Sequence, residues 1–146
     1  MKTAAQLDAE LHELEAYKAK LMRIRRLQAE IMQLEVTGRH AENIQLITEI
    51  VSRRFEVRIE LLIGKRRHQW ICDARFVIWH CAREFTSATL EDIGRLFSGR
   101  DHGTVLCGIT RLKALCECNP AYRSKVDAAL AECRAAFEKK VKAAAA

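Results

Sequence analysis

The chain has 146 residues, of which 49% are hydrophobic and 30% are charged. This composition is too apolar for a disordered chain, and no apolar run approaches the roughly 18–20 residues that span a bilayer. The formal net charge of +6 favours an anionic partner such as nucleic acid. The first residues turn acidic and helical where a signal peptide needs an apolar stretch, so we expect a cytosolic protein.

Residues 5–36 carry apolar side chains at spacings of three and four, which predicts a long amphipathic helix. The helix can be one strand of a coiled coil, although Leu7 and Leu11 belong to a different heptad register from Leu21 and Ile24. It has nothing of its own to pack against. We therefore expect it to join a second copy or a partner protein, or else to fold back on the following domain.

The sequence VTGRHAEN at 36–43 breaks this pattern and predicts a linker. The expected domains are an N-terminal helix with its linker over 1–41, an all-α domain over 42–140 and a tail over 141–146. The sequence has only one proline and six glycines to interrupt helices, so the domain is expected to be mostly helical. The apolar spacing predicts helical segments over 44–55, 58–62, 73–85, 89–97, 101–118 and 121–140, with a basic loop over 64–70.

Six cysteines raise the question of disulfide bonds or a zinc site: Cys72, Cys81, Cys107, Cys116, Cys118 and Cys133. None forms a C-x2-C pair, and the Cys116–Cys118 spacing has no second pair of ligands nearby. Because no export signal is recognised, we interpret the cysteines as reduced thiols and expect neither a metal nor a cofactor.

The sequence GRDHGTVL at 99–106 stands in front of an apolar helical run. Asp101 beside His102 could be an acid/base pair, but the sequence indicates neither a nucleophile nor a metal to complete it. Asp101 as a helix cap after a turn at Gly99 explains the pattern better. The helices over 89–97 and 101–118 then form a helix-turn-helix, whose second helix reaches base edges with its first residues.

The helical spacing places Gly103, Thr104, Cys107 and Arg111 on the face away from the apolar stripe, with His102 at the helix entry. The sequence also clusters its positive charge over 53–67, and the basic loop holds Lys65, Arg66 and Arg67. Charge runs are usually solvated, but a loop that precedes a helix-turn-helix favours contact with DNA. These residues are candidate DNA contacts.

These segments resemble the C-terminal DNA-binding domain of the bacterial replication initiator DnaA. GRDHGTVL carries the resemblance most specifically, and ENIQLITEIVSRRFEV, LLIGKRRHQW and ATLEDIGRLFSGRDH extend it to roughly residues 42–138. The resemblance implies an all-α domain that binds short asymmetric A/T-rich boxes in double-stranded DNA. It implies a bacterial or phage-encoded protein associated with the nucleoid.

The resemblance also implies roles for individual residues. Arg67 takes the place of the family's minor-groove arginine, with Lys65 and Arg66 beside it as phosphate contacts. Asp101, His102 and Thr104 match the family's major-groove readers. We further assign Arg83, where the family has a basic residue near the DNA backbone, and Leu90, Gly103 and Arg111 to the DNA-binding surface.

Three positions depart from the family pattern. Gly103 replaces the threonine that usually follows the histidine, Gln69 replaces a second loop arginine, and Ala74 replaces a proline that usually opens the next helix. These changes affect the target sequence more than the docking mode.

The sequence holds no G-x-x-x-x-G-K-[ST], so we expect no ATPase module and no enzyme activity. The predicted function is a sequence-specific DNA-binding regulator of replication or transcription that recognises DnaA-box-like sites. The alternative is a protein-interaction module that keeps the fold and recruits a partner through its N-terminal helix.

Overall fold

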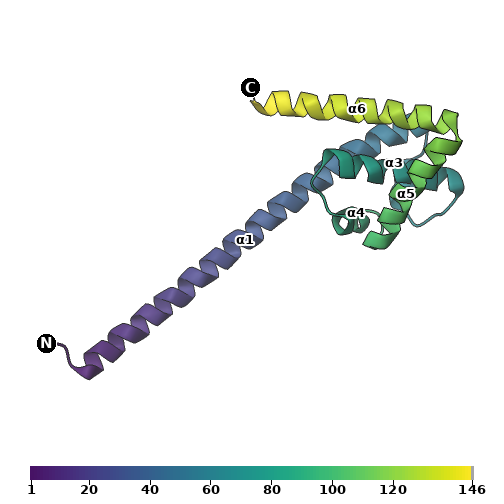
Figure 1. Ribbon diagram of the computed structural model, residues 1–146. Coiled ribbons are helices and arrows are strands. Elements are labelled where there is room, and N and C mark those ends of the chain that lie inside the picture. The colour runs from purple at the N-terminus through teal and green to yellow at the C-terminus, as the bar shows by residue number, and fades with distance from the viewer. Residues whose placement is uncertain (146) are drawn as a thin grey trace. The chain divides into compact units, whose positions relative to one another are not determined.

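The computed structural model describes residues 1–145, and this part of the chain contains helices and no strand (Figure 1). The helices in chain order are α1 (Ala4–Phe55), α2 (Ile59–Ile63), α3 (Gln69–Phe85), α4 (Leu90–Leu96), α5 (His102–Cys118) and α6 (Pro120–Ala145). The expected all-α fold class is confirmed. None of the helices described combines the length and apolar character needed to cross a bilayer.

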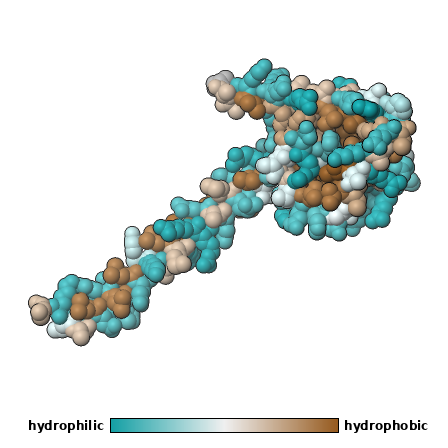
Figure 2. Space-filling model, viewed as in Figure 1, coloured by the Kyte–Doolittle hydropathy of each residue, from teal (hydrophilic) through white to brown (hydrophobic). Residues whose placement is uncertain are grey.

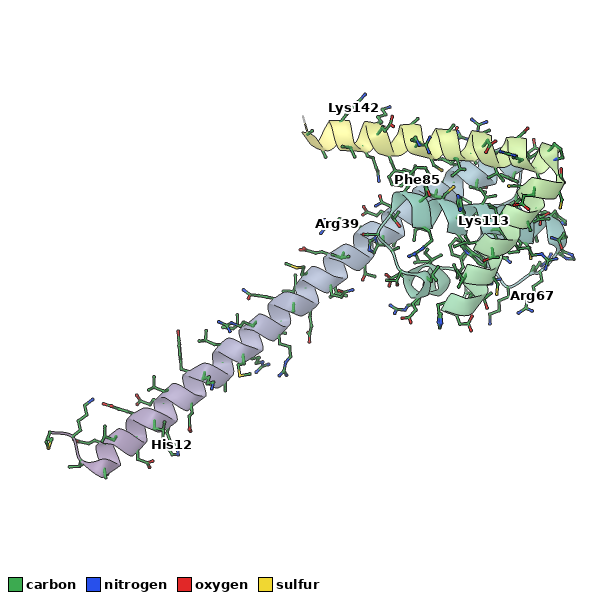
Figure 3. All side chains as sticks on the ribbon, viewed as in Figure 1. His12, Arg39, Arg67, Phe85, Lys113 and Lys142 are labelled. Carbon is green, nitrogen blue, oxygen red and sulfur yellow. The ribbon has the colours of Figure 1, made fainter. Side chains whose placement is uncertain are left out.

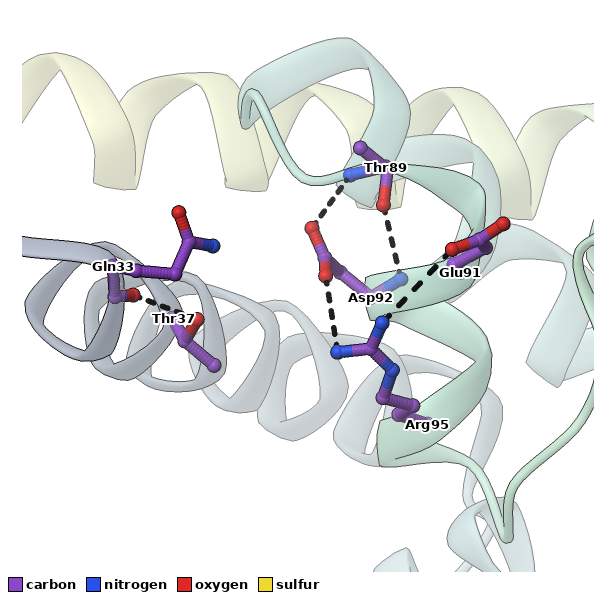
Figure 4. A network of polar contacts seen from close by, with 6 residues as sticks. All are labelled: Gln33, Thr37, Thr89, Glu91, Asp92 and Arg95. Carbon is purple, nitrogen blue, oxygen red and sulfur yellow. Dashed lines mark hydrogen bonds and ion pairs between the residues drawn. The ribbon is translucent and has the colours of Figure 1, made fainter. Parts of the chain in front are cut away.

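Helix α1 runs without interruption through the stretch that was expected to be a linker. Residues 36–43 are helical, so the predicted break there is wrong. Thr37 donates its hydroxyl to the Gln33 carbonyl at 2.9 Å, as a threonine within a helix can (Figure 4). Gly38 costs about 1 kcal/mol relative to alanine, which a helix long on both sides absorbs. The chain divides into two compact units, an N-terminal unit (Met1–Gly38) and a C-terminal unit (Arg39–Ala146).

The C-terminal unit has one hydrophobic core built around α3. Helix α3 packs against α2, α4, α5 and α6, and α5 packs in turn against α4 and α6. The residues of α1 within this unit bury their apolar side chains in the same core, and Phe55 packs its ring edge-on against Tyr122 of α6. The Tyr122 hydroxyl donates to the Asp73 carbonyl at 2.7 Å, which ties α6 to α3.

Helix α3 begins four residues earlier than the spacing predicted. The expected start at Asp73 is wrong, since the helix begins at Gln69. A proline at position 74 would lack the amide hydrogen and would disfavour a helical conformation at residue 73. Ala74 imposes neither restriction, so residues 69–73 can join the helix, and Gln69 donates its side-chain amide to Asp73 Oδ1 at 2.7 Å.

Helices α4 and α5 form the predicted helix-turn-helix. Thr89 caps α4 in a capping box with Asp92, each side chain accepting from the other residue's backbone amide (Figure 4). Gly94 lets the turn approach α4, because a Cβ there would lie 2.0 Å from the Arg100 carbonyl oxygen. Gly99 adopts a φ of +65°, a conformation that glycine tolerates at no steric cost. The close approach and the turn fix the two helices against each other.

Helix α6 extends beyond the predicted end at residue 140. It runs to Ala145, so residues 141–145 of the expected tail are helical, and residue 146 lies outside the described residues. Phe137 of this helix stacks on Phe85 of α3 with ring centroids 5.7 Å apart.

Candidate nucleic-acid interface

The first turn of α5 is fixed by its own residues. Asp101 Oδ1 accepts a hydrogen bond from the Thr104 backbone amide at 2.8 Å and another from the Thr104 hydroxyl at 2.6 Å. These two bonds, the hydroxyl first, hold the pKa of the Asp101 carboxyl below its usual range. The carboxylate satisfies an otherwise unpaired amide at the helix N-terminus. This capping contact explains Asp101 without an acid/base role.

Gly103, Thr104 and Arg111 share one face of α5, and His102 stands at the start of the helix. Val105, Ile109 and Leu112 are buried in the core on the opposite side. His102, Thr104, Cys107 and Arg111 are exposed, and Gly103 is half-buried, as the helical spacing predicts. A Cβ at Gly103 would meet only Asp101 Oδ1, at an ordinary contact distance of 3.7 Å. A Cβ therefore fits at position 103.

The basic loop lies between Gly64 and His68, and its shape is set by a buried arginine from α3. Arg75 is only 2% exposed and donates to four backbone carbonyls. The acceptors and their distances are Leu62 (2.8 Å), Leu61 (3.0 Å), Arg66 (3.0 Å) and Gly64 (3.1 Å). Burial, more than the nearby Arg100 charge, lowers the pKa of Arg75, although a guanidinium keeps its proton in proteins.

A second arginine links the loop to the turn before α5. Arg100 donates to the Gly64 carbonyl at 2.9 Å and to the Phe97 carbonyl, also within hydrogen-bond distance at 2.6 Å. Its guanidinium lies over the Trp79 ring, 6.0 Å from the centroid. Arg75 and Arg100 therefore hold the loop and the helix-turn-helix in a fixed relation.

The loop, α3 and the first turns of α5 line an open groove of about 880 Å³, here called the loop–helix groove. It is lined by six of the predicted site residues, Lys65, Arg67, Asp101, Gly103, Thr104 and Arg111, together with Arg75 and Arg100. Figure 3 shows Arg67 on the loop that precedes α3. The groove thus brings together residues of the basic loop and of the first turns of α5, which lie more than 30 positions apart in the sequence.

Four predicted site residues lie outside the lining of this groove. Arg66 is exposed on the loop and His102 is exposed at the start of α5. Arg83 is exposed near the end of α3 and donates to the Ala88 carbonyl at 3.3 Å. Leu90 begins α4 and is half-buried against the core, so it contributes packing as well as surface.

Sequence reasoning missed Arg75 and Arg100. The signal for Arg75 was its spacing, because it falls four residues after Ile71 and three before Ile78 on the buried face of α3. A charged residue at such a position needs polar partners in the interior. Arg100 gave no comparable signal, since it stands in a turn where basic residues are common.

The charge of the groove is predominantly positive. Among the residues that the structure describes, the exposed Lys65, Arg66, Arg67 and Arg111 make no ion pair with an acidic side chain, and Asp101 is the acidic residue of the lining. Over residues 1–145, all six thiols are free and no three potential metal ligands cluster. The exposed basic side chains are available to an anion.

A helix-turn-helix whose second helix presents its first turn beside a basic loop defines a DNA-binding class of domain. Residues 44–112 match the family described as "Bacterial dnaA protein helix-turn-helix". This match confirms the resemblance of the segment to the DnaA DNA-binding domain that was drawn from the sequence.

Individual relatives agree with this assignment. The chain is 40% identical over 86 residues to the chromosomal replication initiator protein DnaA of Porphyromonas gingivalis, a match that covers 59% of this chain and 18% of the relative. It is 29% identical over 133 residues to the protein of the same name from Oenococcus oeni, covering 85% of this chain and 30% of the relative. The chain spans less than a third of either relative, and the matched family segment is the helix-turn-helix.

A solved structure supports the fold. The crystal structure of a DNA replication initiation factor superposes with a TM-score of 0.61 at 22% sequence identity. The match covers 88% of this chain and 37% of that one.

Proposed function

We propose that the chain binds double-stranded DNA sequence-specifically at DnaA-box-like sites and regulates replication or transcription. The observation that carries the proposal is the loop–helix groove, in which Lys65 and Arg67 share a lining with Asp101 and Thr104. One surface can then contact a phosphate backbone and base edges together.

The proposed docking follows from the two elements of the groove. The first turn of α5 enters the major groove, where Asp101, His102, Gly103 and Thr104 face base edges. The basic loop places Arg67 in the adjacent minor groove, whose narrow A/T-rich form attracts arginine. Lys65 and Arg66 contact phosphates beside it, and Arg111 lies further along the same face of α5.

Arg83 and Leu90 are proposed to lie on the backbone side of this interface. They stand on either side of the α3–α4 connection, and the first helix of a helix-turn-helix crosses the DNA backbone. Arg83 supplies the charge there, while half-buried Leu90 positions the start of α4.

In this proposal the chain acts by occupying DNA rather than by catalysis. Its sequence holds no Walker A pattern, and the family match covers the helix-turn-helix alone. Competition for boxes or recruitment of a partner protein are both compatible with that role.

The second candidate function belongs to residues 5–36. The large apolar side chains from Leu7 to Leu34 are exposed, from 38% for Leu21 to 72% for Leu34. A contiguous apolar surface of this kind is typical of an association site. We propose that this helix joins a second copy or a partner protein, either in addition to DNA binding or in place of it.

The test of DNA binding is a titration of a labelled box duplex at several salt concentrations. Each phosphate neutralised by Lys or Arg contributes a log–log slope of about −0.9, so roughly five contacts give a slope near −4 to −5. A scrambled duplex of equal length is the control for specificity. A slope near zero would exclude the DNA-binding function and leave the interaction module.

A further inference from the structure

The N-terminal unit exposes an apolar stripe along its whole length. Figure 2 shows apolar side chains at the surface of this part of α1. The stripe consists of nine side chains, each exposed: Leu7, Leu11, Leu14, Tyr17, Leu21, Ile24, Leu27, Ile31 and Leu34. Burial of such side chains against a partner removes apolar surface from water, which favours association.

The stripe follows a ten-residue repeat. Residues 7–36 read LDAELHELEA, YKAKLMRIRR and LQAEIMQLEV, with apolar residues at the first, fifth and eighth positions and alanine at the third. Three apolar layers in ten residues give about 3.3 residues per turn, fewer than the 3.6 of an α-helix. The stripe therefore winds around the helix with a left-handed sense, more steeply than a heptad stripe. A second copy of the same segment winds identically, which favours it over a heptad partner.

Charge distinguishes the three repeats and sets the direction of pairing. Residues 7–16 hold four acidic and no basic residues, residues 17–26 hold five basic and no acidic residues, and residues 27–36 hold two acidic residues. A parallel pair in register would place each repeat against its own copy and therefore like charge against like charge. An antiparallel pair brings the acidic first repeat alongside arginines of the second copy.

One antiparallel register matches the stripe from Leu7 to Ile31. When the two copies are centred at the height of Ala19, the apolar layers are Leu7 with Ile31, Leu11 with Leu27, Leu14 with Ile24, and Tyr17 with Leu21. Because the pair is two-fold symmetric, each of these contacts occurs twice, once on either side of Ala19. In this register residues 7–16 oppose residues 22–31, which carry three arginines and one glutamate.

The basic side chains of the second repeat are free to serve this contact. In the described chain, Lys18, Lys20, Arg23, Arg25 and Arg26 make no ion pair, and the first-repeat ion pair of Lys2 with Glu10 involves none of them. Pairing would therefore add ion pairs to these lysines and arginines without breaking any that they already make in the described chain.

We propose that residues 7–31 form an antiparallel, left-handed helical pair with a second copy of this chain, centred at Ala19. The inference rests on the proposed association role of residues 5–36 and commits it to one occupant and one direction. The two Gly38 ends then leave the pair at opposite ends, so each copy keeps its own route to its C-terminal unit.

The experiment measures association of the full chain, without DNA, by sedimentation velocity. The wild type is expected to form a dimer, and circular dichroism checks that each variant keeps its helix content. Glu10→Arg/Glu13→Arg/Glu15→Arg makes the first two repeats both basic and should raise the dimer dissociation constant by at least about tenfold. Arg23→Glu/Arg25→Glu/Arg26→Glu should raise the dissociation constant by a comparable factor, because it sets new glutamates against the acidic first repeat of the second copy.

The combined six-residue variant tests the direction of pairing. Its first repeat is basic and its second is largely acidic, so an antiparallel pair regains opposite charges and the variant should self-associate like the wild type. It should not mix with fluorescently labelled wild type, because an antiparallel mixed pair sets like charges together. In a parallel pair these two expectations reverse.

Three results would overturn the proposal. A monomeric wild type would exclude the dimer, and preferential mixing of the six-residue variant with wild type would exclude the antiparallel direction. An arginine variant that weakens DNA binding while the dimer persists unchanged would assign the basic repeat to nucleic acid. Because association is measured without DNA, loss of the dimer and loss of DNA binding remain separate outcomes.

Discussion

The two sides of the loop–helix groove acquire their shapes in different ways. The first turn of α5 is capped by Asp101, which bonds to Thr104 three residues along the chain. The basic loop has its carbonyls bound by Arg75 from the middle of α3 and by Arg100 from the α4–α5 turn. The helix start depends on its neighbours in sequence, whereas the loop depends on the assembled domain.

This difference makes the loop the more vulnerable side. Arg75 is fully enclosed, and its single guanidinium serves four carbonyls. A change at Arg75 can therefore displace both Lys65 and Arg67. DNA affinity is therefore expected to respond to Arg75, a buried residue that acts through the shape of the loop.

The largest expected effect is that of Arg75→Met. The substitution leaves buried carbonyls without their charged donor and should lower the free energy of unfolding by about 3 kcal/mol or more. DNA affinity should fall with it, because the loop loses its fixed shape. Urea unfolding and a DNA titration below the unfolding transition measure the two effects.

Arg66→Ala is the matched control on the same loop. Its side chain is exposed and makes no hydrogen bond among the described residues, so the free energy of unfolding should change by less than about 0.5 kcal/mol. If Arg75→Met is as stable as this control, the loop does not depend on the buried arginine.

Gly103→Thr sharpens the helix side of the comparison. Position 103 has room for a Cβ, and threonine would present a methyl and a hydroxyl at the first turn of α5. A good base contact discriminates by roughly 1–3 kcal/mol, so the affinity ratio of a DnaA-type box to a scrambled duplex should rise several-fold.

Stability provides the control for this substitution. Threonine also removes part of the cost of glycine in a helix, about 0.5 kcal/mol, which would raise binding to every sequence alike. A higher melting temperature with an unchanged affinity ratio would mean that residue 103 does not face the bases.

The smallest expected effect is that of Asp101 on stability. Its carboxyl pKa is below the unfolded value, so it contributes stability above the unfolded pKa and loses it as pH falls through the folded pKa. Asp101→Asn keeps an acceptor oxygen and should reduce the acid dependence of unfolding below about pH 4. Asp101→Ala should lower the unfolding midpoint at neutral pH as well. Unchanged acid unfolding in both variants would contradict the capping role.

The same contrast explains what the sequence could predict. The helix-turn-helix followed from local signals, since Gly99 and Asp101 each act within a few residues. The exposed face of α5 followed from helical spacing. Both are properties of short segments, and the structure confirms them.

Features that depend on contacts distant in sequence could not be predicted in this way. The four hydrogen bonds of Arg75 join residues 9 to 14 positions apart, and Arg100 reaches Gly64 across 36 positions. The linker predicted at 36–43 failed for another reason, because a lone glycine without proline does not end a helix that is long on both sides.

The central claim is that the loop and the first turn of α5 read DNA as one surface, with Arg67 in the minor groove and Lys65 on a phosphate. The most direct test compares the affinity of Arg67→Ala and Lys65→Ala for an A/T-rich box and for a scrambled duplex. Arg67→Ala should weaken binding to the box most and lower the affinity ratio several-fold. Lys65→Ala should weaken both duplexes about equally and reduce the salt slope by about 1. Equal, sequence-independent losses in the two variants would contradict the claim and make Arg67 another phosphate contact.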